Sequence, residues 1–223
     1  MTFKLFLNAI IKFILGVVLV GVLIFLPAGT LNYSCGWLLM GILFIPMFIA
    51  GLFMMAKNPE LLKKRLSAKE KQFEQGMVLK LSGLMFICGF VLAGLDYRFA
   101  WFTIPFEISL VGAILFLLAY LMYAEVLREN RYLSRTIEIQ EGQKVVSTGL
   151  YGVVRHPMYS ATLLLFISMP IVLGSVIALI PFVAYPFIIS MRIKYEEKML
   201  VNELEGYKEY TEKVKYRLIP FIW

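Results

Sequence analysis

Residues 159–193 read YSATLLLFISMPIVLGSVIALIPFVAYPFIISMRI, and this stretch decides the fold. As one helix these residues would be roughly 52 Å long at about 1.5 Å per residue, which is far more than the ~30 Å hydrocarbon core of a bilayer. The sequence LGS at 173–175 interrupts the stretch, and prolines lie on both sides of it. We therefore predict two antiparallel membrane helices, 159–173 and 175–193, joined by a tight turn.

The rest of the chain is equally apolar. Hydrophobic residues make up 60% of the 223 residues and charged residues only 17%, whereas a soluble domain is roughly half apolar and a quarter charged. Four more stretches are long enough to cross a bilayer: 8–27, 35–56, 77–95 and 104–126. The composition thus predicts an all-α, polytopic membrane helical bundle of about six membrane helical segments.

The placement of basic residues predicts the topology. They gather in three segments: 57–80, 128–155 and 192–217. The links at 28–34 and 96–103 carry only Arg98. Cytoplasmic loops are enriched in Lys and Arg, so six segments with both termini in the cytoplasm place every basic cluster on one side, whereas five would put the last cluster outside. This distribution also explains the net charge of +7 without a nucleic-acid partner.

We expect one integral membrane domain, 1–223. Its N-terminal helices, 1–127, include a cytoplasmic loop at 57–76, where PELLKKRL predicts a short amphipathic surface helix. Residues 128–223 form the half that we expect to bind a cofactor. Within it, 136–149 alternates apolar and polar residues in the manner of a β-hairpin.

His156 is the only histidine of the chain and lies between Arg155 and Pro157, immediately before a membrane helix. Polar groups at such a place are costly and often functional. With one histidine, and with Cys35 and Cys88 showing no ligand spacing, no metal site is expected. A serine hydrolase triad is also disfavoured, because the chain's one aspartate, Asp96, falls at the opposite membrane face.

A second polar group lies at the inner end of the last helix. Arg192, Tyr195 and Glu196 share one face at three- and four-residue spacing, and Glu197 points about 100° further round. Since the two helices form a hairpin, the Arg-His and Glu-Glu pairs should face a common pocket. A ligand that carries both a carboxylate and an ammonium group would match it. Topology-fixing charges and a solvated helix end remain the alternative interpretation.

These residues resemble a known family. GLY at 149–151, VRHPMY at 154–159, LGS at 173–175 and the segment from Arg192 to Leu200 are similar to isoprenylcysteine carboxyl methyltransferases. They are also similar to the wider group of membrane methyltransferases that includes the phospholipid N-methyltransferases. The likeness covers about the last hundred residues well and the first half loosely.

The resemblance implies S-adenosylmethionine as the cofactor and a lipophilic methyl acceptor that enters from the bilayer. It assigns cofactor binding to these residues: Tyr151, Val154, His156, Pro157, Tyr159, Glu196 and Glu197. It assigns catalysis to Arg155, Arg192 and Glu196, with the choice of arginine for the substrate left open. A carboxylate acceptor is already ionised at neutral pH, whereas an ammonium acceptor needs a base, and the scarcity of acid-base groups favours the carboxylate. An amine or phospholipid N-methyltransferase, an NADPH-dependent sterol-reductase-like enzyme and a lipid-binding protein stay open.

Overall fold

The computed structural model of the chain describes residues 3–57, 59–66, 73–133 and 139–223. About 75% of the chain is helical, and the described residues contain no strand, so the all-α prediction is confirmed. The helices are α1 (Phe3–Ala28), α2 (Ser34–Lys57), α3 (Pro59–Leu66), α4 (Phe73–Phe99), α5 (Phe106–Glu129), the 3-10 turn η1 (Gly149–Gly152), α6 (Pro157–Val172), α7 (Leu179–Phe182), α8 (Tyr185–Glu203) and α9 (Tyr207–Lys213).

Four helices are long and apolar enough to cross a membrane: Lys4–Ala28, Ser34–Lys57, Gly76–Phe99 and Phe106–Glu129. They confirm the four segments predicted ahead of the central motif. Helix α6 is equally apolar but has only 16 residues, or about 24 Å, less than the ~30 Å hydrocarbon core. Whether the final hairpin crosses the bilayer therefore stays a prediction.

The second arm of the predicted hairpin differs from the expected single helix. Residues 175–178 form a turn, α7 is one short turn of helix, and α8 begins at Tyr185 and continues to Glu203. Prolines explain the break, because proline cannot donate a backbone hydrogen bond and is tolerated mainly in the first turn of a helix. Pro186 occupies such a first-turn position in α8.

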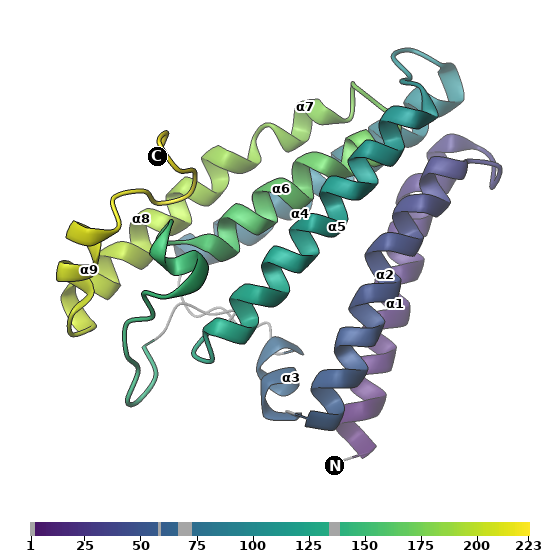
Figure 1. Cartoon of the computed structure of the whole chain (residues 1–223). Helices are drawn as coiled ribbons and strands as arrows, with labels where there is room; N and C mark the ends of the chain where they lie inside the picture. Colours follow the sequence, from purple (N-terminus) through teal and green to yellow (C-terminus); the bar gives the residue numbers. More distant parts are fainter. Residues whose placement is uncertain (1–2, 58, 67–72, 134–138) are drawn as a thin grey trace.

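Three links gather at one end of the bundle, opposite the end that carries α3 (Figure 1). The backbone N–H of Ile104 donates to Gly174 O at 3.1 Å, and that of Val176 donates to Phe102 O at 3.2 Å. The Tyr33 hydroxyl donates to Leu173 O. The links around 28–34 and 96–103 therefore lie beside the hairpin turn.

Asp96 forms hydrogen bonds that connect the links at this end of the bundle. Its side chain is fully buried and accepts a hydrogen bond from the Phe102 N–H at 2.7 Å and another from the Ser175 hydroxyl. The same hydroxyl accepts from the Ala178 N–H at 3.2 Å. Asp96 thus ties α4 to the turn that reverses the chain after α6.

Replacing Asp96 with alanine is expected to lower the free energy of unfolding by about 3 kcal/mol, because two hydrogen bonds are lost and a buried donor left without a partner costs about 1–3 kcal/mol. Thermal unfolding of the detergent-purified protein measures this change. Glu107→Ala, which alters an exposed carboxylate in the first turn of α5, is the matched control. An Asp96→Ala variant as stable as the control would contradict the role of Asp96.

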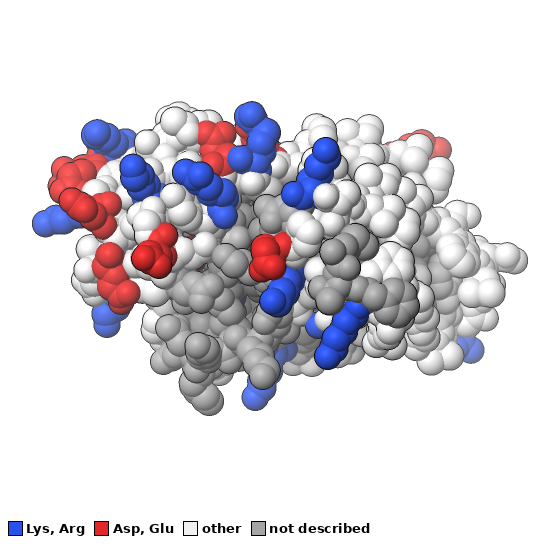
Figure 2. All heavy atoms as spheres, turned by 90° about the horizontal axis from the view of Figure 1, so that it is seen from below, with Lys and Arg blue, Asp and Glu red and all other residues white. Residues whose placement is uncertain are grey.

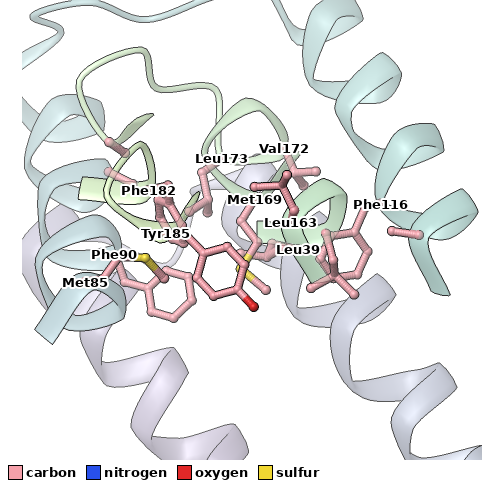
Figure 3. Close-up of a cluster of buried hydrophobic side chains, with 14 of the residues drawn as sticks. Leu39, Met85, Phe90, Phe116, Leu163, Met169, Val172, Leu173, Phe182 and Tyr185 are labelled. Carbon is pink, nitrogen blue, oxygen red and sulfur yellow. The ribbon is translucent and has the colours of Figure 1, made fainter. Parts of the chain in front are cut away.

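Apolar side chains from α2, α4, α5, α6 and the α7–α8 arm fill the centre of the bundle (Figure 3). Phe116 and Phe182 are completely buried there. Gly112 lets α5 approach α6 closely, since a Cβ at this position would lie 2.9 Å from the Val172 backbone nitrogen. Small residues permit such close contacts between membrane helices. The core therefore fixes α6, whose first residues carry the central motif.

The polar segments lie at the other end of the molecule. Viewed from this end, Lys, Arg, Asp and Glu side chains crowd the surface (Figure 2). Helix α3 confirms the predicted helix at 59–66, with Leu62 buried and Lys63 exposed, while residues 67–72 of the predicted loop lie outside the described part. The predicted β-hairpin at 136–149 is wrong for residues 139–148, which form a turn at 141–142 and no strand; its first residues, 136–138, are not described.

Candidate functional site

The start of α6 is held against the C-terminal tail. Pro157 begins the helix and His156 occupies its N-cap position. The backbone N–H groups of Arg155 and His156 donate to Tyr216 O and Arg217 O, both at 2.9 Å. The motif is therefore fixed by a backbone ladder to residues some sixty positions later in the chain, as well as by its own helix.

Glu197 is the centre of an ionic cluster. One carboxylate oxygen accepts from Arg155 Nε at 2.7 Å and lies 3.2 Å from His156 Nε2, while the other accepts from Arg217 Nε at 2.7 Å. The Glu197 side chain is only 10% exposed. Burial raises its pKa, but the hydrogen bonds from His156, Arg155 and Arg217 outweigh burial and lower the pKa to about 2. Glu197 is therefore ionised and joins three separate segments.

Arg155 connects this cluster to the backbone of the C-terminal tail. Its Nη1 donates to Val214 O at 2.7 Å and to Lys215 O at 2.9 Å, and Arg155 is 9% exposed. A buried guanidinium bound to both a carboxylate and backbone carbonyls is a strong, directional connection. The observed bonds of Arg155 thus bind the tail to α8.

A second hydrogen-bonded chain runs from Arg192 through Tyr159 to Glu196. Arg192 Nε donates to the Tyr159 hydroxyl at 2.9 Å, and this hydroxyl donates to Glu196 Oε2 at 2.6 Å. The His156 ring stacks on the Tyr159 ring, with centroids 5.6 Å apart. A positive and a negative side chain are therefore held in fixed positions by one tyrosine, which itself is 5% exposed.

A cavity of about 100 Å³ opens beside this chain. It is lined by Asn130, Tyr132, Leu133, Gln143, Lys144, Val145, Val146, Tyr151, Arg155, His156, Met158, Tyr159, Arg192, Glu196, Met199, Leu200, Leu204, Tyr207 and Tyr210. Pockets for drug-sized ligands measure about 300–1,000 Å³, so a ligand of that size would extend beyond this cavity or widen it. The lining combines charged groups, five tyrosines and aliphatic side chains.

The structure brings most of the predicted site residues to this cavity. Those that line it are Tyr151, Arg155, His156, Tyr159, Arg192 and Glu196. Val154 and Pro157 are buried and do not line the cavity. Glu197 turns into the ionic cluster instead, and Tyr195 is 43% exposed. The two adjacent glutamates therefore occupy different surroundings, which the 100° step between neighbouring helical residues permits.

Sequence reasoning missed the part of the site that α9 and the end of α5 provide. The Tyr210 hydroxyl donates to Tyr151 O at 2.6 Å, and Asn130 Nδ2 donates to the Tyr151 hydroxyl at 2.9 Å. Tyr207 lies one helical turn before Tyr210 on the same face of α9. The three-residue spacing of the two tyrosines was the signal available in the sequence. In the described part of the chain no group of His, Cys, Asp and Glu could hold a metal ion.

A second, larger cavity of about 440 Å³ lies among α1, α2, α3 and α5. Its lining is largely apolar and includes Phe13, Phe48, Met55 and Leu62, with Leu127 near the end of α5. Asn130, three residues further on, lines the first cavity. The polar and apolar cavities therefore both lie at the same end of α5.

Comparison with known families gives one match. Residues 108–206 match the family model described as phospholipid methyltransferase. The match covers a little under half of the chain, from the first turn of α5 through the central motif to α8. It confirms the resemblance to membrane methyltransferases predicted from the motifs. In a comparison with curated proteins, none matched the chain.

Proposed function

Because residues 108–206 match the phospholipid methyltransferase family, we propose that the chain is an S-adenosylmethionine-dependent methyltransferase of a membrane, acting on a lipophilic acceptor. The observation that carries this proposal is the chain Arg192–Tyr159–Glu196. It lines the polar cavity and lies entirely within the matched region. The four long apolar helices provide the membrane anchorage.

The residues present fit the cofactor. S-adenosylmethionine carries an ammonium group and a carboxylate at one end and an aromatic base at the other. In the cavity, Glu196 is an anion that suits the ammonium group, and Arg192 is a cation that suits a carboxylate. Tyr132 and Tyr151 add aromatic surface to the same cavity. When bound, the cofactor supplies an electrophilic methyl group on its sulfonium.

The residues of the chain then act by orientation and exclusion of water. A methyl transfer in line with the breaking bond depends chiefly on holding the two reactants in the right geometry. Tyr159 fixes the directions of Arg192 and Glu196 by hydrogen bonds, and its burial limits access of water. Arg192 orients an anionic group, of cofactor or of acceptor, without any proton transfer.

A carboxylate is the acceptor that requires least of this site, since it is ionised at neutral pH and needs no base. We propose a lipophilic carboxylate, such as that of an isoprenylcysteine, as the first candidate. Phospholipid amine methylation is the second candidate, because the matched family bears that name; Glu196 would then accept the proton. The apolar cavity at the end of α5 suits the hydrocarbon part of either acceptor.

We further propose that the site faces the cytoplasm. The charged surface lies at the end of the bundle that carries α3 (Figure 2), whereas the links that lack basic clusters meet at the opposite end (Figure 1). Positively charged loops are retained on the cytoplasmic side of membranes.

Calorimetric titration of the detergent-purified protein with S-adenosylmethionine tests the proposal. We expect saturable binding of this cofactor and none of NADPH. Radiolabelled methyl transfer in vesicles that contain either a prenylated cysteine or phosphatidylethanolamine then separates the two acceptors. Binding of NADPH alone would indicate a reductase, and binding of neither would leave a lipid-binding protein; both results would reject the methyltransferase.

A further inference from the structure

Tyr207 contains an unsatisfied polar group at the polar cavity. The residue is 4% exposed, and its hydroxyl has no hydrogen-bond partner within the described structure. Burying a polar group without a partner is unfavourable, and such groups are uncommon enough to require an explanation. Tyr207 lines the cavity and its hydroxyl is closed off, so a bound molecule that widens the cavity can supply the missing partner.

Tyr210 provides a direct comparison one helical turn away. It belongs to the same helix, lines the same cavity and is equally buried, at 4% exposed. Its hydroxyl donates to Tyr151 O at 2.6 Å. Two tyrosines of α9 therefore line the cavity. The Tyr210 hydroxyl is hydrogen-bonded to η1, whereas the Tyr207 hydroxyl has no partner in the described structure.

The surroundings of Tyr207 indicate the chemistry of the missing partner. Burial is the main cause that raises the pKa of Tyr207; the negative charges of Glu197 and Glu196 raise this pKa further, while the charge of Arg155 lowers it. The hydroxyl is therefore neutral and lies near carboxylates, where a cationic N–H donor is favoured and an anion is not. A tyrosine oxygen accepts a hydrogen bond from such a donor.

We infer that the Tyr207 hydroxyl is a binding group for the amino-acid end of the methyl donor, accepting a hydrogen bond from its ammonium group. Glu196 binds the same ammonium group by charge. This inference rests on the proposed function and adds to it a residue from α9, outside the region that matches the family. The nucleoside end of the donor makes no contact with Tyr207.

Tyr207→Phe removes only the hydroxyl and tests the inference by calorimetric binding of two ligands. S-adenosylhomocysteine has the amino-acid end, whereas 5′-methylthioadenosine lacks it. We expect the variant to bind S-adenosylhomocysteine about tenfold more weakly, as the loss of one hydrogen bond to a charged group implies. Its affinity for methylthioadenosine should equal that of the wild type.

Thermal unfolding without ligand gives a second readout. Tyr207→Phe should unfold at the same temperature as the wild type or a higher one, because an unsatisfied group is removed, whereas Tyr210→Phe should unfold at a lower temperature. A lower unfolding temperature for Tyr207→Phe would show a partner within the protein and overturn the inference. Unchanged binding of S-adenosylhomocysteine, or equal losses for both ligands, would also overturn it while leaving the proposed function intact. A wild-type protein that binds neither S-adenosylmethionine nor S-adenosylhomocysteine overturns the proposed function and this inference together.

Discussion

Glu197→Ala is expected to lower the free energy of unfolding by about 3–5 kcal/mol, the usual cost of removing one partner from a buried ion pair. The substitution leaves Arg155 without its carboxylate inside the protein, and Arg217 loses the same partner. The tail that carries residues 214–218 should then separate from the start of α6. Thermal unfolding in detergent measures the loss of stability, and limited proteolysis measures the release of the tail.

Glu203→Ala is the matched control, since it removes an exposed carboxylate from the last turn of the same helix.

The pH dependence of the free energy of unfolding provides an independent check on the role of Glu197. The pKa of Glu197 is lowered from 4.5 to about 2, so its stabilising contribution is complete above about pH 4.5 and is lost as the pH falls through about 2. The difference in stability between wild type and Glu197→Ala should be constant above about pH 5 and should shrink in stronger acid. A variant as stable as Glu203→Ala would show that the cluster contributes little.

Glu196→Gln is expected to weaken the binding of S-adenosylmethionine by about 100-fold. Loss of one partner from a buried, hydrogen-bonded charge pair costs about 2–5 kcal/mol in binding, and each 1.4 kcal/mol is a factor of ten. The fold should be retained, because the glutamine side-chain oxygen can still accept the hydrogen bond from Tyr159. Calorimetry measures the affinity, and thermal unfolding verifies the fold.

Glu203→Gln carries the same chemical change at the exposed end of α8 and should bind the cofactor normally. Substitutions of the adjacent residues Glu196 and Glu197 are thus expected to have different effects. Substitution of Glu197 should chiefly affect stability, and substitution of Glu196 should chiefly affect affinity. If Glu196→Gln bound the cofactor with wild-type affinity, Glu196 would have no part in the site.

The sequence predicted the elements whose local pattern is strong. Long apolar runs and the LGS break at 173–175 were sufficient for four long apolar helices and the hairpin turn, because hydrophobic length is directly constrained by bilayer thickness. The sequence could not predict that Glu196 lines the cavity while Glu197 lies in the ionic cluster. This difference depends on the contact between residues 214–218 and the start of α6, and no local sequence pattern encodes such a long-range contact.

The contribution of α9 could not be predicted for the same reason. Tyr207 and Tyr210 lie in a short polar helix that by itself indicates only a solvated segment, and their importance follows from its position against Tyr151. The predicted strands at 139–148 were wrong, because an isolated two-stranded hairpin is only marginally stable without a third strand or a face packed on the core. The turn at Gly142, with φ of 70°, is the part of that pattern that the structure retains.

The backbone ladder between residues 155–156 and 216–217 has a consequence for biosynthesis. A ribosome that has just completed α6 has not yet made the segment against which the first residues of α6 are fixed. Contacts between distant parts of a chain form late, so the cavity should acquire its final shape only after translation of the last helix and the tail. A nascent protein halted within α8 would therefore be inserted in the membrane and still lack a competent binding site.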